Sequence, residues 1–244
     1  MKKFMALLLV AGMTLSLTAC GGSTDTAKTD QADGKDTFTV GFDQDFPPFG
    51  YVGDDGEFTG FDIEMATECA ARMGKKIVLQ PIDWDAKDME LEAGTIDCIW
   101  NGFTMNGRED QYTWTDPYMD NSQVVVVKKD SGINTLADLA GKVVEVQKES
   151  AAETALNDEE HADLMASFAQ LLSVGEYNTA FMDLESGAVD AVAIDIGVAQ
   201  FQIEGKEDQY QILDETISSE QYAVGFFLGN TALRDEVQST LLEM

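Results

Sequence analysis

Short runs rich in Val, Ile and Phe alternate along the chain with stretches in which apolar residues recur every three or four positions. In the first half, this pattern predicts strands at 37–43, 76–82 and 96–101 and helices at 61–74 and 86–94. In the longer helix Ile63, Ala66, Ala70 and Met73 share a face, and we expect Asp62 to be its N-cap. Strands that alternate with helices predict a parallel sheet with crossover helices.

The same pattern starts again after a long β-branched strand at 122–130. It predicts a short helix and strand within 136–147, a helix from 150, a helix at 178–186, strands at 189–195, 210–215 and 222–229, and a last helix at 231–244. The fold class is therefore α/β, built from two similar blocks at 37–125 and 130–214. Two blocks joined by extended segments indicate two lobes with a cleft between them, a common place for a small ligand.

Residues 1–19 differ from the rest of the chain. Two lysines precede an apolar run of about a dozen residues, which is shorter than the roughly 20 that span a membrane, so we expect a secretion signal. The ending LTAC resembles a bacterial lipobox and predicts that Cys20 is lipidated; the alternative is a plain secretory signal with an incidental cysteine. Residues 20–36 contain no large apolar side chain, which predicts a disordered tether with a reach of roughly 20–25 Å.

Acidic residues outnumber basic ones by a wide margin. The formal net charge is −30, and the loss of residues 1–19 with Lys2 and Lys3 leaves 13 basic and 45 acidic residues, or −32. A surface of this charge repels phosphates and anionic lipid headgroups, so we expect no nucleic acid partner.

The chain is poor in residues for catalysis or metal binding. His161 is the only histidine, and we expect it to be a solvated helix residue. Cys69 and Cys98 fall in a predicted helix and a predicted strand, which favours two buried free thiols over a disulfide. Because no nucleophile elbow, phosphate-binding loop or zinc ligand spacing is present, we expect no cofactor, no metal and no enzymatic reaction.

Two opposite charges stand at predicted strand ends, where open α/β sheets bind ligands. Arg108, one of three arginines, offers donors that suit a carboxylate, and Asp195 in the other block offers an anion for an ammonium group. Gly102 allows close approach of a backbone carbonyl. These residues fit a zwitterionic amino acid. The alternatives are that Arg108 pairs on the surface with Glu109 or Asp110, and that Asp195 only caps a helix.

Several motifs in order along the chain resemble the bacterial extracellular solute-binding proteins of family 3, the receptors for polar amino acids of ABC importers. They are DQDFPPFGY, GEFTGFDIEMA, LEAGTIDCIWNGFT, TDPYM with VVVVKKD, DLAGKVVEVQ, LESGAVDAVAID and YAVGFFLGNTALRDEV. The resemblance covers residues 37–244 and implies a two-lobed, type II periplasmic-binding-protein-like fold with two crossover strands as a hinge. It implies lobe 1 at 37–126 and 217–244, and lobe 2 at 127–216.

The resemblance also implies roles for individual residues. Arg108 matches the ligand carboxylate site and Asp195 the α-ammonium site, while Phe46 matches an aromatic residue that covers the ligand side chain. The further positions are Asn101, Gly102, Thr104 and Asp43 in the first block, and Ser150 and Ala151 in the second. Two departures stand out: the MNG turn before Arg108 is one residue short, and ESA at 149–151 replaces a glycine-serine-threonine turn.

The resemblance implies a receptor that hands an extracellular amino acid to the permease subunits of an importer. With the expected lipidation of Cys20, we expect a monomer anchored to the membrane. The alternatives are an exported enzyme of the same fold, of dehydratase or lyase type, and a ligand-sensing domain. Phe46 also fits plain core packing, and Trp84 and Trp100 fit packing in lobe 1 better than ligand contact.

Overall fold

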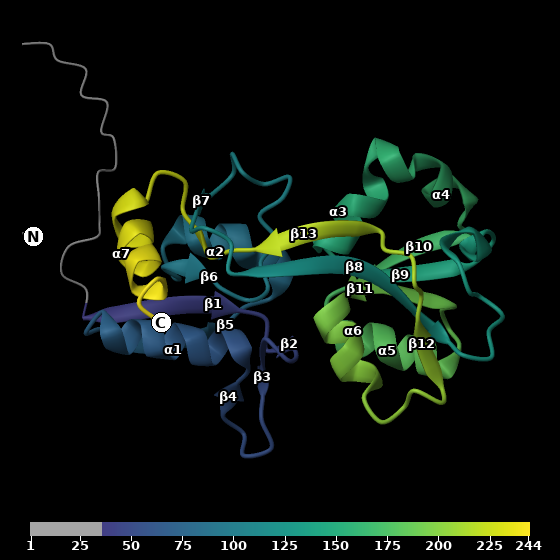
Figure 1. Ribbon diagram of the computed structural model, residues 1–244, viewed down its shortest axis with the longest axis horizontal. Coiled ribbons are helices and arrows are strands. Elements are labelled where there is room, and N and C mark those ends of the chain that lie inside the picture. The colour runs from purple at the N-terminus through teal and green to yellow at the C-terminus, as the bar shows by residue number, and fades with distance from the viewer. Residues whose placement is uncertain (1–35) are drawn as a thin grey trace, which may run out of the picture. The chain divides into compact units, whose positions relative to one another are not determined.

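A computed structural model describes residues 36–244 (Figure 1). The expected signal segment at 1–19, the lipidation site Cys20 and nearly all of the expected tether lie outside the described residues. Within the described part, none of the helices combines the length and the apolar character needed to cross a membrane.

The first lobe is built on a five-stranded sheet. Its strand order is β5 (Lys76–Pro81), β1 (Thr37–Phe42), β6 (Cys98–Ile99), β14 (Gly225–Phe226) and β7 (Thr113–Trp114). β1 pairs in parallel with β5 and β6, whereas β14 is antiparallel to both of its neighbours. Phe38 and Val40 of β1 are buried with residues of α1 (Phe61–Arg72) and α7 (Thr231–Leu241), so these two helices cover a common core.

The N-terminus of α1 differs from the prediction. Gly60, and not Asp62, is the N-cap residue. Asp62 lies in the first turn, fully buried, and its Oδ2 accepts hydrogen bonds from the Gly102 backbone N–H at 2.5 Å and the Tyr118 hydroxyl at 2.9 Å. The prediction was wrong because these tertiary partners, and not the free N–H groups of the helix, bind the carboxylate.

The second lobe is built on a six-stranded sheet. Its strand order is β10 (Gln170–Val174), β9 (Val143–Gln147), β11 (Ala191–Asp195), β8 (Met119–Lys128) and β12 (Tyr210–Ile212), with β13 (Ser218–Tyr222) also paired to β8. Both faces are covered, so the run Val124–Val127 is buried without alternation. α5 (Tyr177–Ser186) and α6 (Ile196–Ile203) contribute to the core on one face. α3 (Ala151–Asn157) and α4 (Ala162–Ser167) contribute to the core on the other.

Two strands carry the chain between the sheets. β7 leads into β8, and β13 leads after two residues into β14 of the first sheet. β8 and β13 pair antiparallel from Ser218 opposite Gln123 to Tyr222 opposite Met119, so the two crossings lie side by side (Figure 1). This topology confirms the predicted two-lobed α/β architecture.

The remaining elements are short. They are β2 (Asp45–Phe46), β3 (Gly50–Val52), β4 (Phe58–Thr59) and α2 (Lys87–Ala93), with 3-10 turns at Trp84–Ala86, Leu136–Leu139 and Glu159–His161. α2 ends at Gly94 with φ 71°, as the sequence predicts. Cys69 and Cys98 are both buried and free, which confirms the predicted thiols.

Candidate functional site

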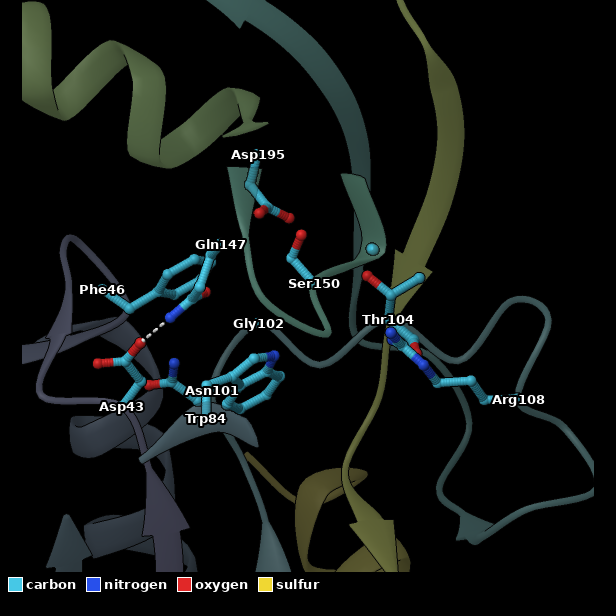
Figure 2. Close-up of a pocket in the computed structure, with 11 residues that line it drawn as sticks. Asp43, Phe46, Trp84, Asn101, Gly102, Thr104, Arg108, Gln147, Ser150 and Asp195 are labelled. Atoms are coloured by element: carbon cyan, nitrogen blue, oxygen red, sulfur yellow. Dashed lines mark hydrogen bonds between the residues drawn. The ribbon is translucent and has the colours of Figure 1, made fainter. Parts of the chain in front are cut away.

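One cavity between the lobes brings together all nine residues that the sequence analysis selects. Asp43, Phe46, Asn101, Gly102, Thr104 and Arg108 come from the first lobe and Ser150, Ala151 and Asp195 from the second (Figure 2). Trp84 and Gln147 also line it. Asp43, Asn101, Ser150 and Asp195 lie at or just after the carboxyl ends of β1, β6, β9 and β11, as expected for ligand sites of open α/β sheets.

The shortened turn before Arg108 leaves the side chain in the cavity. The Arg108 backbone N–H donates to the Met105 carbonyl at 3.0 Å, and Gly107 has φ 77°, which closes a tight turn. The guanidinium nitrogens donate to the carbonyls of Thr104 at 3.1 Å and Glu149 at 3.4 Å. Within residues 36–244, no ion pair joins Arg108 to Glu109 or Asp110. The partners of the buried cation are therefore neutral.

Asp195 supplies the negative charge of the site. It stands at the N-cap position of α6 but makes no capping hydrogen bond. Instead its Oδ1 accepts from Asn121 Nδ2 and Gln123 Nε2, each at 2.7 Å, and from the Tyr222 hydroxyl at 2.6 Å. Burial and the neighbouring Glu220 carboxylate raise the pKa of Asp195 to about 7, although the three donors oppose the rise.

Asp43 joins the two lobes directly. Its Oδ2 accepts a hydrogen bond from Gln147 Nε2 of the second lobe at 2.6 Å (Figure 2), and its Oδ1 accepts from the Asp45 backbone N–H at 2.8 Å. Burial raises the pKa of Asp43 to about 6, against the effect of both donors. The carboxylate is thus a polar group of the cavity wall that already has a partner across the cleft.

Aromatic side chains close the remaining walls. Phe46 lines the cavity and also packs on Phe49 and Tyr177, with ring centroids 5.7 and 6.0 Å apart. Trp84 likewise has two contacts, because it lines the cavity and meets Phe103 edge to face at 5.5 Å. Trp100 is fully buried in the first lobe's core, as predicted.

Gly102 is tightly confined. It has φ 56°, and a Cβ there would lie 2.8 Å from Phe46 Cε1 and 3.1 Å from Tyr222 Cε2. The neighbouring Asn101 is 2% exposed, and its Oδ1 has no hydrogen-bond partner among the described residues. Asn101 and Gly102 both line the cavity, and the close packing leaves no room for a side chain at position 102.

The ESA turn of the second lobe has a distinct geometry. Glu149 has φ 57°, the only non-glycine residue of the described chain with a positive φ. Its carboxylate forms an ion pair across the cleft with the buried Lys87 at 2.9 Å. Ser150 caps α3, since its hydroxyl accepts from the Glu153 backbone N–H at 3.1 Å. Residue 149 thus joins this turn to the first lobe.

Sequence reasoning missed several residues of the site. Gln147 ends strand β9, so the strand-end rule could have found it. Glu220 carries no comparable signal. It reaches Asp195 only through Asn121 and Gln123, and these residues lie 99 and 97 positions from it along the chain.

The fold and the cleft define a two-lobed binding protein, and the comparison with known proteins gives the family. The chain belongs to the bacterial extracellular solute-binding proteins, family 3, whose pattern matches residues 38–244. It is 30% identical to the L-cystine-binding protein TcyJ of Escherichia coli over 98% of this chain and 87% of that protein. It is 29% identical to the arginine-binding extracellular protein ArtP of Bacillus subtilis over 100% and 93%.

Solved structures agree with this assignment. An ABC uptake transporter substrate-binding protein from Streptococcus pneumoniae with bound histidine has a TM-score of 0.81 and 33% identity, covering 85% of this chain and 86% of that one. Tv2483 bound to L-arginine also has a TM-score of 0.81, with 28% identity and coverage of 86% and 85%. The family and these relatives are binding proteins, so the chain is a solute-binding protein and not an enzyme.

Proposed function

We propose that this protein captures an extracellular amino acid and delivers it to an ABC importer. The observation that carries the proposal is the pair Arg108 and Asp195, a cation of the first lobe and an anion of the second that line one cavity. An amino acid zwitterion needs a cation for its carboxylate and an anion for its ammonium group. Relatives named for cystine and arginine, and structures that hold histidine or arginine, support a polar amino acid as ligand.

In this proposal Arg108 binds the α-carboxylate in a bidentate fashion, because its present partners are only neutral carbonyls. Asp195 binds the α-ammonium through the carboxylate oxygen that makes no hydrogen bond to the described residues. Gly102 and Thr104 add a carbonyl and a hydroxyl beside Asn101, and Ser150 and Ala151 add the second lobe's wall.

The same proposal gives the ligand side chain a place. Phe46 covers it, and Asp43 lies within reach of its polar end, since both residues line the cavity on the first lobe's side. A buried carboxylate at that end favours a polar or cationic side chain over an apolar one.

Ligand entry requires the lobes to separate. The cavity has a volume of about 10 Å³, which suits about one water molecule and no amino acid. Contacts across the cleft hold the lobes together, among them Asp43 with Gln147 and Lys87 with Glu149. The pair Lys148 with Asp85 at 2.6 Å also crosses the cleft but is exposed to solvent. We place the hinge in β8 and β13, with lobe 1 at 37–126 and 217–244 and lobe 2 at 127–216. Ligand contacts to both lobes then favour closure.

We also propose that Cys20 is lipidated after removal of residues 1–19. A tether at 20–36 then holds a monomeric receptor at the outer face of the cell membrane, near its importer. Mass spectrometry of the protein isolated from membranes tests this, because the proposal predicts a diacylated N-terminal cysteine. An unmodified N-terminus, or recovery only in the soluble fraction, contradicts it.

The binding proposal is tested by a thermal-shift panel of the common amino acids plus cystine, followed by calorimetry of each that raises the melting temperature. We expect a polar amino acid to bind with one-to-one stoichiometry, and to be recovered unaltered after incubation. The absence of binding by every amino acid would overturn the proposal.

A further inference from the structure

We infer that Asp195 and Glu220 hold one proton between them in the ligand-free protein, and that the ammonium group of a bound ligand displaces it into solvent. This inference rests on the proposed function. It adds Glu220 as a positioning residue that acts on the ligand only through Asp195, and it makes ligand binding depend on pH.

The two carboxylates share their donors. Asn121 Nδ2 lies 2.7 Å from both Asp195 Oδ1 and Glu220 Oε1, and Gln123 Nε2 lies 2.7 Å from the same two oxygens. Each amide nitrogen has two hydrogens, so each amide bridges both acids. The two oxygens therefore lie on one small donor cluster, close enough for strong repulsion if both acids are ionised.

Both acids are also shielded from water. Asp195 is 4% exposed and Glu220 is 7% exposed. Repulsion between like charges is strong at such a site because the surroundings screen it poorly. When two carboxylates share a buried site, the affinity of the pair for a first proton rises.

The groups that face the pair from the surrounding elements are largely neutral. β8 contributes the amides of Asn121 and Gln123, α5 contributes Tyr177, and β13 contributes the hydroxyl of Tyr222, which donates to Asp195. The Thr104 hydroxyl donates to Glu220 Oε1 at 2.8 Å. None of these groups supplies a positive charge.

The arginine of the site has other partners. Arg108 lines the same cavity, but its guanidinium donates to the carbonyls of Thr104 and Glu149. Among residues 36–244, no ion pair links any Lys or Arg to Asp195 or Glu220. Two buried negative charges with donors but no cation are unfavourable, and a proton is the available neutraliser.

Burial and the charge of Glu220 raise the pKa of Asp195 to about 7, which agrees with this geometry. The ligand brings its own ammonium group. Once that cation contacts Asp195, the ionised form is favoured and the proton leaves to bulk water. The ammonium group of the ligand replaces one proton, and each carries one positive charge. The net charge of the cluster is therefore the same with the ligand bound as with the proton bound.

Calorimetry in two buffers of different ionisation enthalpy, at pH 6, measures the protons released per ligand bound. The ligand should be the amino acid that binds best among those with no group titrating between pH 5 and 8. We expect the intact protein to release a substantial fraction of one proton. The affinity should rise by up to about tenfold per pH unit from pH 5 to 7 and level off by pH 8.

Glu220→Gln is the decisive variant, because it keeps the acceptor for Asn121, Gln123 and Thr104 and removes the charge. We expect it to bind the ligand with a flatter pH profile and to release fewer protons at pH 6. Glu145→Gln is the matched control, since Glu145 is a carboxylate of β9 that is 1% exposed and does not line the cavity. It should keep the pH profile of the unaltered protein.

Three results overturn the inference. The first is ligand binding by the unaltered protein without proton release. This measurement tests the inference even if Glu220→Gln does not fold. The second is an unchanged pH profile in Glu220→Gln. The third is loss of proton release in Asp43→Asn but not in Glu220→Gln, which would assign the proton to Asp43. In each case the amino acid still binds, so the proposed function survives; if no amino acid binds at any pH, the proposed function fails and this inference fails with it.

Discussion

The two charged ends of the cleft are built in opposite ways. At one end the Arg108 guanidinium meets only two backbone carbonyls, at 3.1 and 3.4 Å, and stands 5.5 Å from the Phe103 ring centroid. At the other end Asp195 Oδ1 accepts three hydrogen bonds of 2.6–2.7 Å, and a second carboxylate shares two of the donors. The cation is loosely held, whereas the anion is tightly held.

This difference shows how a buried charge is kept ready for a ligand. Guanidinium groups in proteins are always charged, so the positive charge at this end persists with weak neutral acceptors that a carboxylate can replace. Asp195 can take up a proton, and many donors are needed to keep it partly ionised beside Glu220. The arginine end therefore supplies a constant charge, and the aspartate end supplies one that depends on pH.

The largest expected effect is at the arginine end. Arg108→Ala should weaken amino acid binding by about 2–5 kcal/mol, because the bound carboxylate would be buried without a partner. Isothermal titration calorimetry measures the loss. Arg234→Ala is the control, since Arg234 lies on α7 and does not line the cavity, and it should leave the affinity unchanged. An unchanged affinity in Arg108→Ala would remove this residue from the site.

Asp195→Asn should weaken binding by about 1.5–3 kcal/mol, the usual value of a hydrogen bond to a charged group. The asparagine oxygen can still accept from Asn121, Gln123 and Tyr222, so the fold should persist. The affinity of this variant should also lose its dependence on pH between 5 and 8. Calorimetry at pH 6 and 8 checks both points, and a variant that binds like the unaltered protein contradicts the assignment.

The stability of the ligand-free protein should fall as the pH rises. Burial raises the pKa of Asp195 and of Asp62 to about 7, so both carboxyls take up protons more readily in the folded state than in the unfolded state. Their contribution to stability is fully present below about pH 4 and is lost as the pH rises through about 7.

Denaturant unfolding at pH 5 and pH 8 measures this effect, which should be about 2–3 kcal/mol for each of the two carboxyls in favour of pH 5, because about two pH units separate pH 5 from the folded-state pKa. Asp195→Asn should make the difference smaller. A higher stability at pH 8 than at pH 5 would show that neither carboxyl is protonated in the folded chain.

The smallest effect concerns the ion pair beside Arg108. Lys87→Met removes the bond across the cleft from a buried lysine to Glu149, and should weaken ligand binding by about 0.5–1 kcal/mol, because fewer contacts hold the lobes closed. Lys148→Met is the matched control: its pair with Asp85 is exposed on both sides, so its effect should be close to zero. Equal losses in the two variants would argue against a special role for Lys87.

The sequence predicted the two-lobed architecture, most elements and nine of the eleven residues that line the cavity. Arg108, Gly102 and Asp195 follow from their places at strand ends of open α/β sheets, and the other six from the family resemblance. The prediction failed where tertiary contacts decide. Asp62 looks like a helix cap in isolation, yet the Gly102 N–H and the Tyr118 hydroxyl bind its carboxylate. Glu220 could not be placed beside Asp195 from the sequence, because the two acids meet only through the amides of β8. The register between β8 and β13, which the sequence does not show, brings Glu220 to those amides.

The central claim is that one amino acid is held by its carboxylate and its ammonium group together. The most direct test titrates the unaltered protein at pH 7.5 with the best-binding amino acid, its methyl ester and its N-acetyl derivative. The account predicts that the ester, which lacks the carboxylate, and the acetylated form, which lacks the ammonium, each bind at least about a hundredfold more weakly. Binding of either derivative as tightly as the parent amino acid would contradict the account.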